Sequence, residues 1–166
     1  MAISARLMPI ARAPAFRTIL QAGLLAGVLD GLDAVVYFCG IQGIPVMRLF
    51  QYIASGALGP RSFKGGVETA LLGLGFHFLV ATGAAGTYYL LTLAFPELLK
   101  NPLLVGPLFG VGVYLFMYKV VIPMSAAPPQ PPASAGKIVN QLFTHTLFVG
   151  LSIALVVRRA ALGSRG

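Results

Sequence analysis

The stretch TILQAGLLAGVLDGLDAVVYF, residues 18–38, decides the fold class. Its only charged side chains are Asp30 and Asp33, and Arg17 stands directly before it. A helix that rises about 1.5 Å per residue needs about 20 apolar residues to cross the hydrocarbon of a bilayer, and this run supplies them. A buried helix of a soluble protein would need a polar face, which this run lacks. The stretch therefore predicts a transmembrane helix.

Three more apolar runs have comparable length and are bounded by prolines or bases: residues 69–95, 103–122 and 138–157. Each is long enough to cross a bilayer. We therefore predict an all-α integral membrane protein in which residues 1–166 form a single transmembrane domain. Its expected architecture is a four-span antiparallel helical bundle.

The composition supports a membrane protein and excludes several other classes. Of the 166 residues, 57% are hydrophobic and 10% are charged, whereas a soluble domain has about 25% charged residues. The net charge of +8 comes from bases that lie between the apolar runs rather than on one stripe, so nucleic-acid binding is not expected. The single cysteine, Cys39, cannot form an intrachain disulfide. Phosphate-loop, dinucleotide, zinc-protease and nucleophile-elbow motifs are missing, so we do not expect an enzyme.

A shorter amphipathic segment, residues 45–58 (PVMRLFQYIASGAL), lies between the first two runs. It carries one base, Arg48, and no acid, and Gly59-Pro60 follows it. This pattern predicts an interfacial helix on the outer side of the membrane, because a full span would bury the arginine.

The basic residues also predict an orientation. With an even number of spans both termini lie on one side, and that side carries seven bases: Arg6, Arg12, Arg17, Lys100, Arg158, Arg159 and Arg165. The other side carries five: Arg48, Arg61, Lys64, Lys119 and Lys137. The positive-inside rule therefore favours cytoplasmic N- and C-termini.

Small residues recur at helical spacing in three of the runs. The candidate helix-packing glycines are Gly23, Gly27, Gly31, Gly73, Gly106 and Gly110. Because lipid is as apolar as leucine, spans associate through such close-packing faces. These faces could join helices of one chain, a homo-oligomer or another membrane protein, or they could reflect the general abundance of glycine in membrane helices.

Ionisable side chains in hydrocarbon are costly and need a partner, a cavity or a function. Counting about 1.5 Å per residue from the outer boundary places five of them within about 12 Å of it: Asp30, Asp33, His77, His145 and Lys119. This common depth predicts a proton- or cation-binding cavity in the outer half of the bilayer. In that interpretation the acids bind the proton or cation, the histidines relay or ligate it, and Lys119 supplies a counter-charge. The alternative is a structural ion pair that fixes helix register.

Two histidines on separate spans leave several chemistries open. His77 and His145 could ligate haem between facing helices, hold a divalent metal together with an aspartate, relay protons, or form structural hydrogen bonds. No cofactor is predicted, and haem or a divalent metal stays an alternative. Membrane-interface anchoring is the expected role of four tyrosines: Tyr88, Tyr89, Tyr114 and Tyr118.

A set of residues from His77 to Arg159 resembles the YagU-like family of small bacterial inner-membrane proteins. The matching features are His77, Tyr88, Phe95-Pro96, the Gly106/Gly110 pair, Pro123, Leu142-Phe143-Thr144-His145 and Arg158-Arg159. The chain departs from the family pattern in the apolar segment 40–66, which replaces a longer polar insert, and in the Asp30/Asp33 pair. The resemblance implies a bacterial inner-membrane location and points to the two histidines, without supplying a mechanism.

Together these features predict a membrane protein that handles protons or ions without being an enzyme. The alternatives are a structural or assembly subunit of a membrane complex, or a haem- or metal-binding membrane protein. The expected partners are the lipid bilayer and a second copy or another membrane protein.

Overall fold

The computed structural model describes residues 15–163, and within this range the chain forms helices and loops but no strand. Four helices are long and apolar enough to cross a membrane: Ala15–Ile41, Gly66–Ala94, Pro102–Met124 and Ala135–Gly163. They are compatible with a multi-pass membrane protein. Apart from Phe95, which follows the second helix, the predicted spans lie inside these helices. Three bases that entered the orientation prediction, Arg6, Arg12 and Arg165, lie outside the described residues.

The first two spans and the segment between them contain five elements: α1 (Ala15–Ala34), η3 (Val35–Ile41), α2 (Val46–Leu58), η4 (Gly59–Lys64) and α3 (Gly66–Ala94). The rest of the chain contains seven: η5 (Pro96–Leu99), α4 (Pro102–Phe116), η6 (Met117–Val121), α5 (Ile122–Met124), α6 (Ala135–Phe143), η7 (Thr144–Leu151) and α7 (Ser152–Gly163).

Local sequence signals explain where several of these helices begin or end. Pro45 directly precedes α2, and Gly59 follows it with φ 62°, a left-handed conformation that glycine adopts without steric cost. Pro96 stops α3, because a proline restricts the residue before it to extended backbone. At the start of α6, the Ser134 side chain accepts a hydrogen bond from the backbone N–H of Lys137 at 3.2 Å.

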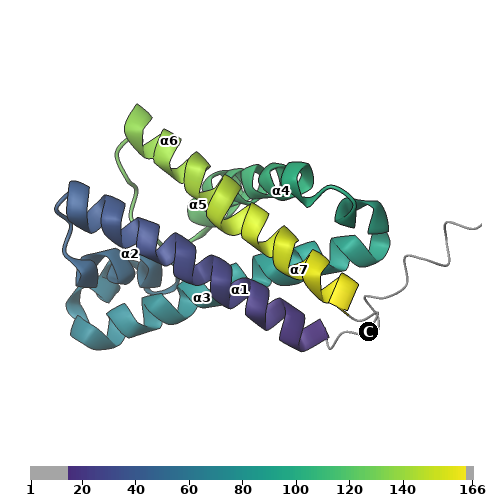
Figure 1. Cartoon of the computed structure of the whole chain (residues 1–166). Helices are drawn as coiled ribbons and strands as arrows, with labels where there is room; N and C mark the ends of the chain where they lie inside the picture. Colours follow the sequence, from purple (N-terminus) through teal and green to yellow (C-terminus); the bar gives the residue numbers. More distant parts are fainter. Residues whose placement is uncertain (1–14, 164–166) are drawn as a thin grey trace, which may run out of the picture.

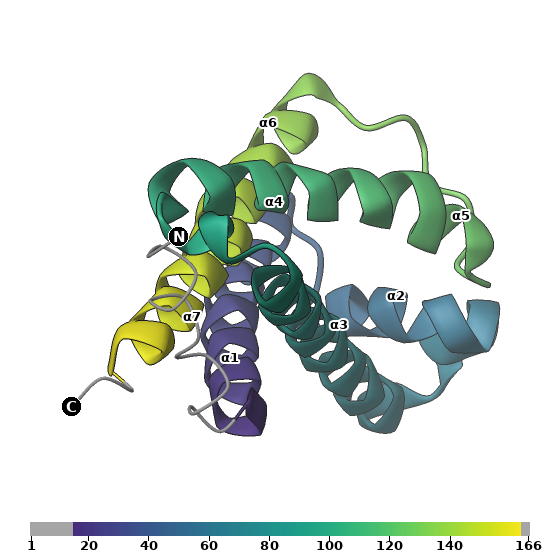
Figure 2. The same cartoon turned by 90° about the vertical axis from the view of Figure 1, so that its right-hand side faces the viewer.

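The helices form two packed groups, one of α2 and α3 and the other of α4, η7 and α7, and α1 contacts both groups. α3 packs against α1 and α2, whereas α4 packs against η7 and α7, and α1 also contacts α7 and η7. The start of α1 and the end of α7 lie at the same end of the molecule (Figure 1). From the turn that connects them, α3 and α4 diverge (Figure 2). The two groups are therefore joined through α1, whereas α3 and α4 move apart beyond the turn that connects them.

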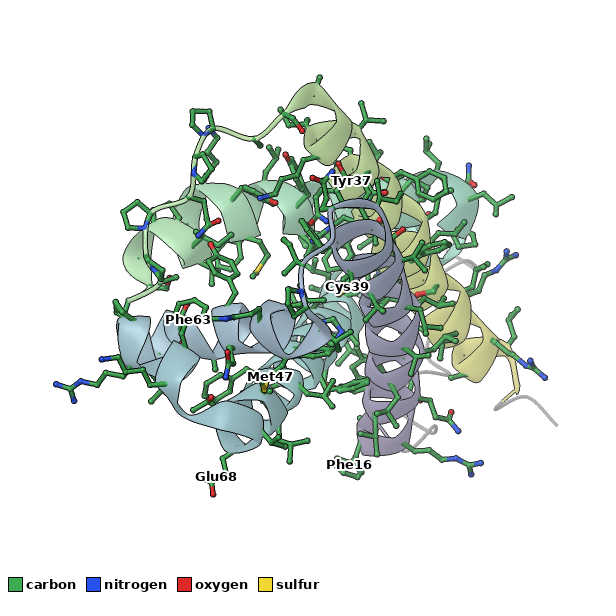
Figure 3. All side chains as sticks on the ribbon, turned by 90° about the vertical axis from the view of Figure 1, so that its left-hand side faces the viewer. Phe16, Tyr37, Cys39, Met47, Phe63 and Glu68 are labelled. Atoms are coloured by element: carbon green, nitrogen blue, oxygen red, sulfur yellow. The ribbon has the colours of Figure 1, made fainter. Side chains whose placement is uncertain are left out.

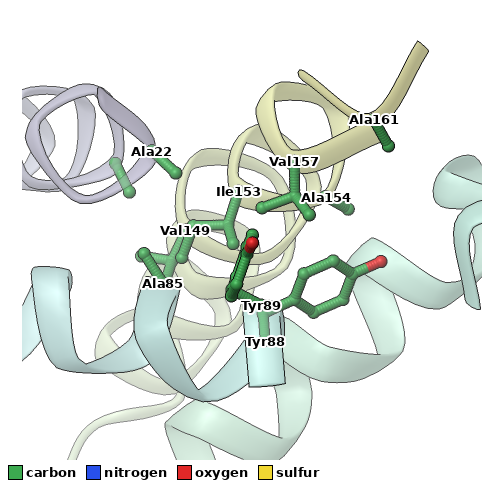
Figure 4. Close-up of a cluster of buried hydrophobic side chains, with 10 residues drawn as sticks. Ala22, Ala85, Tyr88, Tyr89, Val149, Ile153, Ala154, Val157 and Ala161 are labelled. Atoms are coloured by element: carbon green, nitrogen blue, oxygen red, sulfur yellow. The ribbon is translucent and has the colours of Figure 1, made fainter. Parts of the chain in front are cut away.

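A tightly packed apolar core fills the end of the bundle where α1 begins and α7 ends. Small side chains of α1 and α3 meet larger ones of α7, and Ala22, Ala85, Ile153 and Val157 have no exposed surface (Figure 4). Tyr88 of α3 lies in the same cluster and makes an edge-to-face ring contact with Phe109 of α4, at 5.0 Å between centroids. The ionisable residues Asp30, Asp33, His77 and His145 lie farther from this end along their helices.

Three of the four spans change from α-helix to the wider π-helix: η3, η6 and η7 are π-helical. A π-turn bonds each N–H to the carbonyl five residues back, and such turns occur often at functional sites. Here Asp33 lies two residues before η3, Tyr118 lies in η6, and Thr144 and His145 begin η7. The wider turns therefore coincide with the polar residues of three spans.

Candidate functional site

An acid and an imidazole from different spans face each other between α1 and α3. The Nδ1 atom of His77 lies 3.7 Å from Oδ2 of Asp30, within ion-pair range but beyond hydrogen-bond length. The His77 side chain is 10% exposed and that of Asp30 is 23% exposed, so the pair is largely but not completely shielded.

The other ring nitrogen of His77 settles which atom carries hydrogen. Nε2 lies 2.8 Å from the carbonyl oxygen of Gly27 on α1. A carbonyl only accepts hydrogen bonds, so Nε2 must carry the hydrogen and donate it. In a neutral ring Nδ1 therefore holds a lone pair, which faces the carboxyl group of Asp30. Two acceptors that face each other repel, and one proton on either Nδ1 or the carboxyl group turns the contact into an attraction.

The second acid, Asp33, has different partners. Its Oδ2 accepts hydrogen bonds from Nδ2 of Asn140 at 2.8 Å and from the Thr144 hydroxyl at 2.6 Å. Thr144 has no exposed surface, and both donors lie on the fourth span. Asp33 thus ties α1 to α6 and η7 through neutral donors, which stabilise a carboxylate.

His145 lies near the Asp30 carboxyl group and next to aromatic rings. Its Nδ1 donates to the carbonyl oxygen of Gln141 one turn earlier at 2.9 Å, so Nε2 is its remaining polar atom. Its ring centroid lies 5.7 Å from that of Tyr114 on α4, in an edge-to-face contact. Asp30 is close enough for electrostatic interaction with three groups: His77, His145 and Asp33.

Two further tyrosines extend this group toward α2. Tyr114 and Tyr118 pack ring against ring with centroids 4.7 Å apart. Tyr118 is also within electrostatic range of Asp30 and of Tyr52 on α2. Burial raises the pKa of the Tyr52 hydroxyl above its ordinary value, so Tyr52 is an uncharged phenol near neutral pH. Ring contacts and electrostatic interactions thus link residues of α1, α2, α3, α4, η6 and η7.

Glycines on α1 let α3 approach closely enough for the acid–imidazole contact. A Cβ atom at Gly23 would lie 2.5 Å from Cα of Thr82, and one at Gly27 would lie 2.7 Å from the Phe78 ring. A Cβ at Gly31 would lie 3.2 Å from Nε2 of His77. All three predicted packing glycines of the first span therefore lie against α3.

The remaining predicted packing glycines contact other elements. Gly106 and Gly110 lie against the fourth span, and a Cβ at Gly110 would overlap the backbone carbonyl of His145. Gly73 lies against α2, where a Cβ would overlap the carbonyl of Phe50. Each of these positions brings two backbones together, as expected for small residues between membrane helices.

Lys119 lies apart from the acids. Its side chain is exposed, and across residues 15–163 no ion pair joins it to Asp30 or Asp33. It was the expected counter-charge, but in the structure the ionisable groups that interact with Asp30 are the two histidines and Asp33. The difference is one of helix rotation, because depth along a span does not determine which face carries a side chain.

Ligand geometry in the described part of the chain gives no support to a metal centre. No three side chains of the types His, Cys, Asp and Glu between residues 15 and 163 converge as metal ligands. In His77 only Nδ1 has a lone pair, because Nε2 donates to Gly27.

Depth in the bilayer and charge predicted the acids and histidines of the site, but the roles of four other residues near them were missed or misinterpreted. Tyr114 and Tyr118 were expected to be interface anchors, Thr144 was named only within a motif of the family resemblance, and Tyr52 was regarded only as part of the interfacial segment. The position of Thr144 beside His145, with Asn140 one turn earlier, was the one available signal.

The four spans and the ionisable groups between them are compatible with the class of polytopic membrane proteins that enclose polar residues. No protein family, curated protein or solved structure matches this chain.

Proposed function

We propose that this chain is a proton-binding multi-pass membrane protein in which Asp30 and His77 share one proton in the outer half of the bilayer. The site would load and release that proton as the pH on the outer side changes. Of the chemistries that the sequence left open, proton binding has the most support from the geometry.

The carrying observation is the orientation of His77. Because Nε2 donates to Gly27, Nδ1 holds the lone pair of the neutral ring, and Nδ1 lies 3.7 Å from Oδ2 of Asp30. The uncharged ring beside an ionised carboxyl group is the unfavourable arrangement, and one added proton removes the repulsion. The site is not sealed by the protein, since 23% of the Asp30 side chain is exposed.

The charges around Asp30 support the same conclusion. Asp33 accepts hydrogen bonds from two neutral donors, and two ionised carboxylates at short range in a poor dielectric are costly. No lysine or arginine in residues 15–163 forms an ion pair with either acid. Neutralisation of the second negative charge therefore depends on a proton held by Asp30, His77 or His145.

We further propose the membrane arrangement that this function needs. The four spans would run antiparallel, with both termini in the cytoplasm of a bacterium and the Asp30 site near the outer face of its inner membrane. α2 would lie in the outer interface, where its single base Arg48 reaches water. The charge bias and the YagU-like features support this arrangement.

The two alternative functions have less support. An assembly subunit that docks through Gly23, Gly27 and Gly31 would need these positions free, but α3 covers them. Haem or metal ligation by His77 would use Nδ1, since Nε2 donates to Gly27, but within residues 15–163 no three side chains of the types His, Cys, Asp and Glu converge as metal ligands.

Proton uptake by the purified chain tests the proposal. Full-length protein in detergent is acidified stepwise at fixed ionic strength, and bound protons are counted against a detergent blank. We expect Asp30→Asn and His77→Gln each to bind about one proton fewer than the wild type between pH 4 and 8. The matched control is Glu68→Gln, which removes an exposed carboxylate of α3 that points away from the bundle (Figure 3).

The two variants together keep the test decisive. Loss of the same single proton in Asp30→Asn, in His77→Gln and in the double variant supports a shared site, because independent groups would lose two in the double variant. Uptake curves of both single variants that superimpose on the wild type would overturn the proposal. Proteoliposomes then measure whether binding leads to transport: a flux equal to that of empty vesicles excludes a transporter but leaves proton binding intact.

A further inference from the structure

A basic hollow lies at the C-terminal end of α7. Its volume is about 560 Å³, and five residues line it: Leu155, Arg158, Arg159, Leu162 and Gly163. The first four follow the spacing i, i+3, i+4 and i+7, so they share one face of the helix. Ile153 and Val157 lie on the opposite face, without exposed surface, in the apolar core. The α7 hollow therefore opens away from the core, at the edge of the bundle (Figure 1, Figure 2).

The two arginines of the α7 hollow have no acidic partner among the side chains around them. Across residues 15–163 neither Arg158 nor Arg159 forms an ion pair with a carboxylate. The whole sequence contains only four acidic side chains. Two lie near the end of α1, Glu97 pairs with Lys100, and Glu68 lies in the first turn of α3, far from η5 and α7. An anion from outside the chain therefore has two guanidinium groups to bind.

We propose that the α7 hollow binds an anionic phospholipid, whose phosphate the two arginines hold and whose acyl chains contact the leucines. A guanidinium group presents its N–H donors in a planar fork that matches the oxygens of a phosphate. The C-terminal end of a helix repels anions weakly, so the arginines must supply the attraction. Asp30 lies near the other end of α1, so this proposal does not depend on the proton site.

The place of the hollow on its helix favours a lipid over a free phosphate ion. α7 ends the candidate span Ala135–Gly163, and the end of a span lies where lipid headgroups meet the hydrocarbon. Leu155 precedes the arginines by about one turn and Leu162 follows them by about one turn, and the two leucines are 43% and 47% exposed. Basic residues beside exposed apolar ones complement a ligand that has an anionic head and apolar chains.

Native mass spectrometry of the full chain tests the proposal, with phosphatidylglycerol and phosphatidylcholine of identical acyl chains as probes. We expect the wild type to prefer phosphatidylglycerol, because each base near a headgroup favours the anionic lipid about fivefold. Arg158→Gln and Arg159→Gln should each lose about fivefold of that preference, and the double variant about 25-fold. An equal preference in the wild type and the double variant would overturn the proposal.

The matched control removes two bases from a different part of the chain. Arg61→Gln combined with Lys64→Gln changes two exposed residues of η4 and lowers the net charge by the same amount. Its lipid preference should stay within about twofold of the wild type, because exposed charges are screened over such distances. Equal losses in the two double variants would overturn the proposal, since net charge would then explain the binding. The single variants keep the test valid if the α7 double variant does not fold.

Inorganic phosphate and a leucine variant distinguish a lipid from a free anion. Phosphate at about tenfold excess over the lipid should not displace phosphatidylglycerol, because it makes no apolar contact with the leucines. Leu162→Ser should weaken the binding of both lipids alike and leave the preference between them unchanged. Displacement of the lipid by phosphate, or unchanged binding of both lipids in Leu162→Ser, would overturn the assignment to a phospholipid.

Discussion

His77 makes two contacts with α1 at once: its Nε2 donates to the carbonyl of Gly27 at 2.8 Å, and its Nδ1 faces Asp30 at 3.7 Å. The two acceptors lie about one helical turn apart, so the imidazole plane is held along the helix and cannot flip without breaking the Gly27 bond. Which nitrogen of His77 carries the hydrogen therefore depends on how α1 and α3 pack. The glycines that allow this packing thus affect the chemistry of the site.

We expect Gly31→Val to displace His77 from Gly27 and to change its proton binding. Even a single Cβ at this position would lie 3.2 Å from Nε2, and the branched side chain of valine leaves less room. Nitrogen NMR of labelled histidine should report hydrogen on Nε2 in the neutral wild-type ring and a mixture of tautomers in the variant. The control is Gly40→Ala on the same span, where a Cβ has open space. An unchanged His77 spectrum in Gly31→Val would contradict this contact.

Thr144→Val should destabilise the fold by about 1–3 kcal/mol, because it leaves Asp33 with one fewer hydrogen-bond donor in a buried site. The lost hydroxyl donates to Oδ2 of Asp33 at 2.6 Å, and valine has nearly the same shape. Thr87→Val is the matched control: that hydroxyl is exposed and bonds only to its own helix, at Gly83, so we expect a change within about 0.5 kcal/mol. Denaturation in mixed micelles measures both, and equal stabilities would mean that Asp33 does not need the bond.

Two glycines of α4, two residues apart, should respond in opposite ways to alanine. Gly110 lies against the backbone of His145, so Gly110→Ala overpacks the contact with the fourth span and should cost about 1–3 kcal/mol. Gly112 has open space around it, so Gly112→Ala should be neutral or stabilise the helix by up to about 1 kcal/mol. Thermal unfolding followed by circular dichroism distinguishes them. The same loss in both variants would indicate that helix flexibility, rather than packing, explains the glycines.

Deprotonation of Tyr52 should weaken the packing of α2 at alkaline pH. Burial raises the pKa of its hydroxyl above the ordinary value of 10.0, so the folded state keeps the proton that the unfolded state gives up. The stabilising contribution is complete below pH 10.0 and is lost as the pH rises through the folded-state pKa. We expect the unfolding temperature in detergent to fall more steeply above this pH in the wild type than in Tyr52→Phe. Lysine titration is common to both proteins, so parallel curves would contradict the prediction.

Much of the site was predictable because burial of charge is costly wherever it occurs. Asp30, Asp33, His77 and His145 stood out as ionisable residues in apolar runs, and their similar distances from the span ends suggested a common depth. Lys119 satisfied the same criterion but its side chain is exposed. Depth follows from residue count, whereas the rotation of a helix depends on its neighbours.

The pairing of these groups could not be predicted from the residues alone. Which aspartate contacts which span depends on the glycine contacts of α1 and on the π-turns at η3, η6 and η7, which change the direction of every side chain that follows. Tyr114 and Tyr118 were expected to anchor the membrane interface, because their spacing gives no information about a ring on another helix.

The order of the amino acids by itself determined four long apolar helices, their approximate ends and a short amphipathic helix before the second span. These features depend on hydropathy, proline and glycine, which act locally. Only the tertiary structure decided that His77 meets Asp30 while Asn140 and Thr144 meet Asp33. The reason is physical: hydrophobicity places a helix in the bilayer, but close packing of small residues, which depends on both surfaces, decides how helices turn toward each other.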